Sequence, residues 1–246
     1  MSESEVRVFA SLEELSHAAA ALFTQLVCRR AAEGKSFVAA LSGGSTPRRL
    51  YELLGGTPYA RQIPWGNVHL FQVDERCVPP GHPDSNYRMV REALLNRVPL
   101  PAANFHRMAA EAADREEAAR QYAAELARVL QPQLGESPRL DLVFLGMGVD
   151  GHTASLFPGS PALAERTLWV RLNFGEKLGT PRMTLTFPVL NAAAQAVFLV
   201  SGAEKAETLR RVLRGPLEPE RLPAQGVRPV NGQVSWYVDK AAARLL

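Results

Sequence analysis

The sequence predicts an α/β fold with a mostly parallel, twisted sheet that helices cover on both faces. Strand-like segments alternate with helical ones along the 246 residues. Several of the strand segments are apolar along their whole length, which is typical of strands buried on both faces. No clean linker, internal repeat or low-complexity segment divides the chain, so we expect one domain over residues 1–246.

The first half of the chain contributes three helices and two strands to this prediction. We expect helices at 11–33, 47–55 and 85–97, and strands at 37–41 and 68–73. Ser11 and Glu14 have the spacing of a capping box, and Gly34 is a typical residue to follow a helix. Pro47 suits the first turn of the second helix, because its φ angle is fixed near the helical value.

The second half continues the same alternation. We expect helices at 114–130 and 203–213, strands at 140–146, 167–172, 182–187, 196–201 and 234–239, and a short helix at the C-terminus. Pro132, Gly135 and Pro138 separate the first of these helices from the strand that follows it.

Composition and charge describe an ordinary soluble globular protein and exclude two classes of partner. The chain is 46% hydrophobic and 22% charged, with a formal net charge of only +3. It has no lysine-rich tract and no alternation of aromatic and basic residues, so we expect no nucleic-acid partner. No apolar run approaches the ~18 residues of a membrane span, so we expect no membrane partner and a cytoplasmic location.

The two cysteines favour neither a disulfide scaffold nor a zinc site. Cys28 and Cys77 lie far apart in the sequence and form no C-x-x-C motif. We expect Cys28 to belong to the buried stripe of its helix.

The first polar cluster is a glycine- and hydroxyl-rich turn between a strand and a helix. It consists of Ser42, Gly43, Gly44, Ser45 and Thr46. Backbone N–H groups and hydroxyls at a helix N-terminus form a site for an anion, and phosphate is the natural ligand. The turn lacks the lysine and the spacing of a Walker motif. The structural alternative is a tight turn with a Ser/Thr helix cap.

The second polar cluster follows the strand at 68–73. Asp74, Glu75 and Arg76 are three consecutive charges at the end of an apolar segment. Unpaired burial of such charges is costly, so we expect them to face a wet cleft or to pair with one another. The alternative is an ordinary ion pair at the start of a loop.

The third cluster begins as GMGVDG at 146–151, which satisfies G-x-G-x-x-G after a strand. A dinucleotide site would need a long helix next and an acid ~20 residues later, at the end of the next strand. Pro158 and Gly159 interrupt too soon for that helix, and no acid follows at that place. Asp150 and His152 instead form an Asp-x-His pair on a glycine-lined loop, where a histidine is suited to act as a general base. A metal site would need a third ligand at a suitable spacing, and we expect none.

Five segments together resemble the 6-phosphogluconolactonases, in order and at suitable distances. They are LSGGSTPRRLYELL, VDER with DSNYRMVREALL, LDLVFLGMGVDGHTASLFPGS, PRMTLTFPVLNAA and VSGAEKAETL. The resemblance extends from about residue 6 to about residue 240, and GVDGHTASLFPGS is its most specific part. It implies a single Rossmann-like domain of the type shared with glucosamine-6-phosphate deaminases and ribose-5-phosphate isomerases.

The resemblance also implies an activity and the residues that carry it. The implied reaction is hydrolysis of 6-phospho-D-glucono-1,5-lactone to 6-phosphogluconate, the second step of the oxidative pentose phosphate pathway, with neither a metal nor an organic cofactor. His152 matches the general base, and Asp150 lies in the same loop. Asp74 and Arg76 match an acidic and a basic site residue. The 42–46 turn, Arg182 and Lys205 match the phosphate-binding positions. Cys77, directly after Asp-Glu-Arg, departs from the family pattern.

These candidate site residues suit lactone hydrolysis by direct attack of water. A lactone is an activated ester, so a positioned base and stabilisation of the oxyanion suffice. No G-x-S-x-G elbow is present for a serine hydrolase. Two alternatives remain: a glucosamine-6-phosphate deaminase-like isomerase and a non-catalytic sensor of sugar phosphates. We expect a phosphorylated sugar lactone as ligand and a monomer or a small homo-oligomer.

Overall fold

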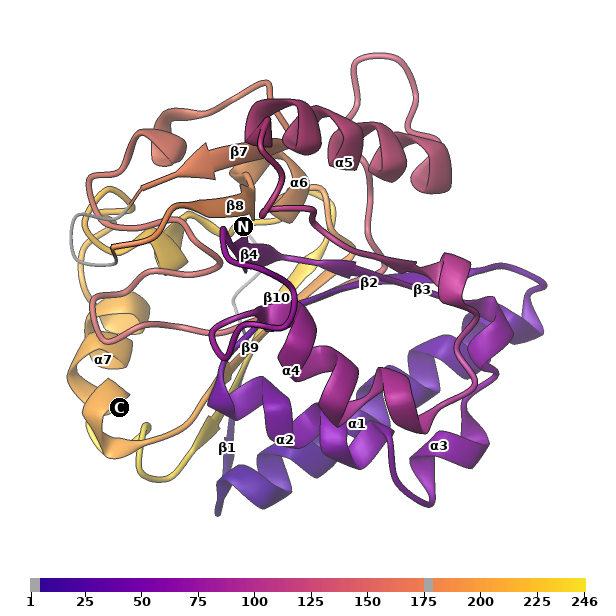
Figure 1. Cartoon of the computed structure of the whole chain (residues 1–246). Coiled ribbons are helices and arrows are strands. Elements are labelled where there is room, and N and C mark those ends of the chain that lie inside the picture. The colour runs from indigo at the N-terminus through magenta and orange to yellow at the C-terminus, as the bar shows by residue number, and fades with distance from the viewer. Residues whose placement is uncertain (1–4, 175–178) are drawn as a thin grey trace.

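A seven-stranded parallel sheet forms the centre of the computed structural model, which describes residues 5–174 and 179–246 (Figure 1). The strands, in spatial order, are β1 (Glu5–Phe9), β10 (Gln233–Asp239), β9 (Gln195–Val200), β6 (Leu142–Leu145), β2 (Phe37–Leu41), β3 (Val68–Gln72) and β5 (Phe105–His106). All neighbouring strands of this sheet pair in parallel. Their carboxyl ends therefore meet at one edge of the sheet, where loops can build a site.

Helices cover both faces of the sheet, as predicted. One face carries α1 (Leu12–Ala32), α2 (Ser45–Leu54), α3 (Tyr59–Gln62) and α4 (Asn86–Ala93), and the other carries α5 (Arg115–Leu130), α6 (Phe187–Leu190) and α7 (Ala206–Arg214). Alternate residues of β2 divide between the two cores, Ala39 facing one and Ala40 the other. Short 3₁₀ turns lie at Trp65–Asn67, Leu95–Arg97, Ala102–Asn104, Pro161–Ala164, Ala203–Lys205 and Pro223–Gly226.

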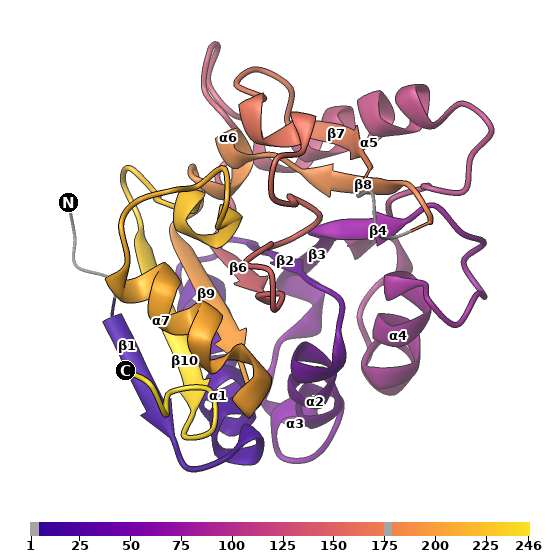
Figure 2. The same ribbon diagram turned by 90° about the vertical axis from the view of Figure 1, so that its left-hand side faces the viewer.

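A second, antiparallel sheet accompanies the large one. It contains β4 (Asp74–Arg76), β8 (Arg182–Leu185) and β7 (Val170–Asn173), in the order β4-β8-β7. Figure 2 shows these three strands running across the direction of β9 and β10. The sequence predicts strands near β7 and β8 but neither their antiparallel pairing nor a separate strand at Asp74–Arg76. β4 and β8 lie more than 100 residues apart in the chain, so no local pattern reveals their pairing.

Most predicted elements are confirmed with boundaries shifted by a few residues, and further differences lie at the two ends of the chain. The N-terminal strand β1 was not predicted; it is short, lies at the edge of the sheet and pairs only with β10, so its residues are mostly exposed. The C-terminal residues 240–246 form turns instead of the predicted short helix. Among the described helices, none combines the length and the hydropathy that a membrane span needs.

The prediction that Cys28 is buried was wrong. Ser11 caps α1 as expected, accepting a hydrogen bond from the backbone N–H of Glu14. The buried stripe of this helix reaches Leu26 and Val27. Each helical residue advances by ~100° around the axis, which carries Cys28 out of the stripe and into solvent.

Glu165 anchors the turn before β7 and provides a test of acid stability. Its side chain is only 9% exposed and accepts backbone N–H bonds from Arg166, Thr167 and Leu168, at 2.9, 2.8 and 3.0 Å, and an ion pair from Arg171 at 2.7 Å. The N–H groups of Leu168 and Thr167 lower the pKa of Glu165 from 4.5 to about 2. This stabilisation is complete above pH 4.5 and is lost as the pH falls through about 2.

We expect Glu165→Gln to lower the free energy of unfolding by on the order of 2 kcal/mol at pH 7. The gap to wild type should shrink as the pH falls below 4.5, because the Glu165 carboxylate of the unfolded wild-type chain then takes up a proton while that of the folded protein stays ionised down to about 2. Urea unfolding at pH 7, 5 and 3 measures this, with Glu136→Gln on an exposed turn as the control. Equal stability of Glu165→Gln and wild type at pH 7 would contradict the assignment.

Candidate active site

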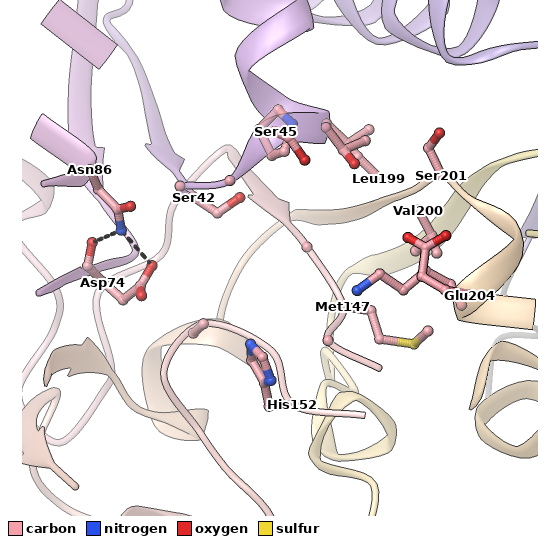
Figure 3. A pocket seen from close by; sticks show the side chains of 18 of the residues that line it. Ser42, Ser45, Asp74, Asn86, Met147, His152, Leu199, Val200, Ser201 and Glu204 are labelled. Carbon is pink, nitrogen blue, oxygen red and sulfur yellow. Dashed lines mark hydrogen bonds between the residues drawn. The ribbon is translucent and has the colours of Figure 1, made fainter. Parts of the chain in front are cut away.

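A cavity of about 260 Å³ opens at the carboxyl ends of β2, β3, β6 and β9 (Figure 3). The loops that follow these four strands line it. The lining residues are Ser42, Gly43, Gly44, Ser45, Thr46, Pro47, Asp74, Arg76, Asn86, Gly146, Met147, Gly148, His152, Ala154, Leu199, Val200, Ser201, Glu204 and Lys205. Nine of the eleven predicted site residues are therefore brought together: all except Asp150 and Arg182.

The 42–46 turn lies at the N-terminus of α2, as predicted. Gly44 is the N-cap and has a φ of 105°, which favours glycine, and no side chain caps the helix there. The N–H groups of the first turn of α2 thus face the cavity without an internal acceptor. Ser42 is 4% exposed, and its Oγ is buried without a hydrogen-bond partner within the described parts of the chain. Both features suit an anionic ligand.

Gly43 leaves room for Asn86, the first residue of α4. A Cβ on Gly43 would lie 1.8 Å from Oδ1 of Asn86, so no side chain fits there. The Nδ2 group of Asn86 donates to the backbone oxygen of Asp74 at 2.9 Å and to its Oδ1 at 3.3 Å. Asn86 therefore lies between the anion-binding turn and the acidic residue of the second cluster, as Figure 3 shows for Asp74 and Asn86.

We expect Gly43→Ala to lower kcat/KM at least ~10-fold, since the new methyl group must displace Asn86 or the turn itself. A steady-state assay of the variant with a thermal melt measures activity and folding together. Gly66→Ala is the matched control, because nothing lies within 4 Å of a Cβ placed there. If Gly43→Ala retained full kcat/KM, the close fit of turn and Asn86 would be irrelevant to function.

The Asp74-Glu75-Arg76 cluster divides its side chains between two directions. Asp74 and Arg76 line the cavity, as expected for a wet cleft. Glu75 points away, is 2% exposed, and accepts hydrogen bonds from the backbone N–H groups of Asn86 and Tyr87 at 2.8 and 2.7 Å. The carboxylate of Glu75 thus holds the N-terminus of α4 in place. Alternation along strand β4 is the physical reason for the division.

Arg76 keeps one donor unsatisfied. One Nη group donates to the backbone oxygen of Asp84. Its Nε is buried and has no partner among the residues that the structure describes. A buried N–H group without an acceptor is costly, so a ligand oxygen in the cavity would bind favourably there.

The loop after β6 presents His152 to the cavity, and Asp150 on the same loop holds the imidazole ring. The Nδ1 atom of His152 lies 2.6 Å from Oδ1 of Asp150, which also accepts the backbone N–H of His152 at 3.1 Å. Asp150 thereby directs the Nδ1–H tautomer and leaves Nε2 free to accept a proton. Burial raises the pKa of Asp150, but the hydrogen bonds to its carboxylate and the electrostatic attraction of His152 together outweigh burial, and the pKa falls from 3.8 to about 2.

Glycines make this geometry possible. A Cβ on Gly148 would lie 2.1 Å from Nδ1 of His152 and 2.5 Å from Oδ1 of Asp150. Gly151 has a φ of 83°, in the region that favours glycine. The aromatic ring of Phe157 packs beside His152, with ring centroids 4.8 Å apart. The ring of His152 is thus fixed on three sides and open toward the cavity.

The segment after His152 connects its loop to Asp74. Ala154 has a φ of 50°, a strained value for a residue with a Cβ. Ser155 is buried; its N–H donates to Oγ1 of Thr184 at 3.2 Å and its Oγ donates to Oδ2 of Asp74 at 2.7 Å. Both carboxylate oxygens of Asp74 are thereby held, one by Ser155 and the other by Asn86.

The two basic residues assigned from short motifs lie in different surroundings. Lys205 lines the cavity from the 3₁₀ turn that precedes α7, next to Ser201 and Glu204. Arg182 lies on β8 opposite Arg76, is 9% exposed, and donates to the backbone oxygen of Thr180 at 3.2 Å. Burial and the nearby charge of Arg76 lower the pKa of Arg182. Arg182 thus adds positive charge behind Arg76 and is not part of the cavity lining.

Sequence reasoning missed Asn86, Ser155, Ser201 and Glu204 as residues of the site or its support. Asn86 and Ser155 lie inside quoted motifs, but a lone amide or hydroxyl carries no signal until its partner is known. Cys77, by contrast, is half-buried, its pKa is raised by burial, and it is not among the cavity-lining residues. Across the described residues, no group of three His, Cys, Asp or Glu side chains could hold a metal ion.

Comparison with known proteins identifies the family of this chain. The family model described as glucosamine-6-phosphate isomerases/6-phosphogluconolactonase matches residues 10–236. The chain is 43% identical to a 6-phosphogluconolactonase of Synechocystis sp., over 98% of both chains. It is 42% identical to a 6-phosphogluconolactonase of Nostoc sp., over 84% of this chain and 83% of the relative.

A solved structure agrees with these relatives. The 6-phosphogluconolactonase of Trypanosoma brucei superposes with a TM-score of 0.87 at 29% identity, over 99% of this chain and 98% of the other. The family model, the relatives and the solved structure agree on the family. The chain therefore belongs to the glucosamine-6-phosphate isomerase/6-phosphogluconolactonase family.

Proposed function

We propose that this protein hydrolyses 6-phospho-D-glucono-1,5-lactone to 6-phospho-D-gluconate, the second step of the oxidative pentose phosphate pathway. The observation that carries the proposal is the Asp150–His152 pair, 2.6 Å apart, at the rim of a cavity whose other loops suit a phosphate. The names of the full-length relatives support the same reaction. We also propose that residues 1–246 act as one lactonase domain, as a monomer or a small homo-oligomer.

In the proposed mechanism, Nε2 of His152 takes a proton from a water molecule as the water attacks C1 of the lactone. The carbonyl oxygen becomes an oxyanion, and Arg76 or the backbone N–H groups of the glycine loops stabilise it. His152 then returns the proton to the ring oxygen as the C1–O bond breaks. The water adds one oxygen to C1 and the ring oxygen leaves as a hydroxyl, so atoms and electrons balance without a metal or an organic cofactor.

The phosphate group is proposed to bind at the other side of the cavity. The N–H groups of Gly44, Ser45 and Thr46 at the start of α2 would donate to it, and Lys205 would neutralise part of its charge. Arg182 contributes through its positive charge near Arg76, or through direct contact if its side chain leaves the carbonyl of Thr180. Binding the phosphate fixes the distance from C1 to His152.

A deaminase-like isomerase is the alternative from the same family. It would need a glutamate after the Asp-Gly-His turn to assist ring opening. The first acid after His152 is Glu165, whose carboxylate is engaged by the turn at 166–168 and by Arg171. The engagement of Glu165 therefore favours the lactonase over the isomerase. A sensor without catalytic function would have no use for an oriented His152.

One assay separates these three functions. A pH-stat measures acid release from freshly generated 6-phosphogluconolactone, corrected for spontaneous hydrolysis, and ammonia release from glucosamine 6-phosphate is measured in parallel. We expect rapid lactone opening and no ammonia. Ammonia release would indicate the isomerase, and binding of 6-phosphogluconate without either reaction would indicate the sensor.

We expect Lys205→Ala to raise KM for the phosphorylated lactone about 10-fold or more, with kcat nearly unchanged, because the lysine binds a group remote from the reacting carbon. Initial rates over a range of substrate concentrations measure both constants. Lys35→Ala removes an exposed lysine that pairs with Glu33 and lies outside the cavity lining, so it should behave as wild type. An unchanged KM in Lys205→Ala would remove Lys205 from the phosphate site.

A further inference from the structure

Asp239 is a buried carboxylate that ends strand β10 one residue beyond the last paired position of β9. Val238 pairs with Val200, so Asp239 lies level with Ser201. Asp239 is 7% exposed and is not among the cavity-lining residues. Neither the sequence motifs nor the proposed mechanism gives it a role.

Three donors converge on this carboxylate. Its Oδ2 accepts the hydroxyl of Ser201 at 2.6 Å and the N–H of Gly202 at 3.2 Å, and its Oδ1 accepts the N–H of Ala242 at 2.7 Å. Burying a carboxylate is costly unless such bonds satisfy it, so the arrangement is specific and not incidental. Asp239 thereby joins the turn after β9 to the end of β10.

The turn that Asp239 holds is the one that carries Lys205. Gly202 has a φ of 106° and a ψ of 141°, a conformation that favours glycine, and its carbonyl accepts the N–H of Lys205 at 3.1 Å. A Cβ on Gly202 would lie 2.4 Å from the carboxylate of Glu204. The conformation of this single glycine therefore sets where the first residues before α7 lie, and Asp239 fixes the N–H of that glycine.

We propose that Asp239 is a positioning residue for phosphate binding: it holds Ser201 and Gly202 so that Lys205 faces the cavity. The inference rests on the proposed function, because it takes the ligand at Lys205 to be the phosphate of the substrate. Asp239 itself touches neither the phosphate nor the lactone. Its removal should therefore weaken binding of phosphorylated ligands and leave the chemistry at C1 intact.

The test compares a phosphorylated and an unphosphorylated substrate. We expect Asp239→Ala to raise KM for 6-phosphogluconolactone at least ~10-fold with kcat within ~3-fold of wild type. For glucono-1,5-lactone, which has no phosphate, kcat/KM should stay within ~2-fold of wild type. Asp239→Asn keeps one carbonyl acceptor and should fall between Asp239→Ala and wild type.

Asp141→Asn is the matched control. Its carboxylate also accepts a strand N–H, that of Val38 at 2.9 Å, but it lies at the start of β6, at the opposite end of the sheet from the cavity. We expect it to lower thermal stability without changing the preference for the phosphorylated lactone. A purely structural role of Asp239 would give the same pattern as this control.

A binding measurement keeps the inference independent of catalysis. In a calorimetric titration, Asp239→Ala should bind 6-phosphogluconate with a Kd at least ~10-fold higher than wild type and should bind gluconate with an unchanged Kd. If wild type binds 6-phosphogluconate but hydrolyses no lactone, the proposed function fails. The effect of Asp239→Ala on the Kd for 6-phosphogluconate can still be measured in that case. If Asp239→Ala and Asp239→Asn bind both ligands as wild type does, or lose both equally, the inference is wrong.

Discussion

Replacing His152 with alanine is expected to lower kcat for lactone hydrolysis at least ~100-fold, with little change in substrate binding. The imidazole is the proton acceptor in the proposed attack of water, and its Nε2 faces the cavity while Asp150 holds Nδ1. The phosphate contacts lie on other loops and should survive the substitution. The pH-stat assay measures kcat and KM together, after correction for spontaneous hydrolysis.

The control for this prediction is His82→Ala. His82 lies on an exposed loop and does not line the cavity, so the variant should turn over as wild type does. Near-normal turnover of His152→Ala would refute the assignment of the general base. A rise in KM with kcat unchanged would instead make His152 a substrate-binding residue.

Asp150→Asn is expected to lower kcat on the order of 100-fold while the fold stays intact. An asparagine can turn its NH₂ group toward Nδ1 of His152, which favours the tautomer whose Nε2 carries the hydrogen and cannot accept a proton. The same kinetic assay, with a thermal melt for stability, measures the effect.

The pH dependence sharpens this prediction. The pKa of Asp150 is lowered from 3.8 to about 2, so its charge is fully present above pH 4 and is lost only as the pH falls through about 2. Because Asp150 is ionised throughout the range from pH 5 to 9, Asp150→Asn should lower kcat at every pH in that range. Asp114→Asn, which keeps the N-cap of α5, is the matched control. A shifted profile with unchanged maximal kcat would contradict an orienting role.

The fold was largely predictable because most of its elements are specified locally. The Ser11 cap, the apolar strands β2 and β6, and Gly44 before α2 each act over a few residues. The pairings that were missed join distant parts of the chain: β1 with β10, and β4 with β8. Such pairings depend on tertiary contacts and have no signature in the segments themselves.

The site was predictable to the extent that its residues belong to long motifs. His152 and the 42–46 turn lie where the motifs place them, since each follows a central strand directly. Arg182 came from a short motif that fixes its strand but not the direction of its side chain. Asn86 became visible only through its fit against Gly43, a contact between α4 and the loop after β2.

The most direct test of the whole account is a crystal structure of the wild-type protein with 6-phosphogluconate bound. We expect the phosphate at the N–H groups of Gly44–Thr46 and at Nζ of Lys205, and the C1 carboxylate within ~3.5 Å of Nε2 of His152. The opposite orientation, with the phosphate at His152, or binding outside this cavity, would contradict the account.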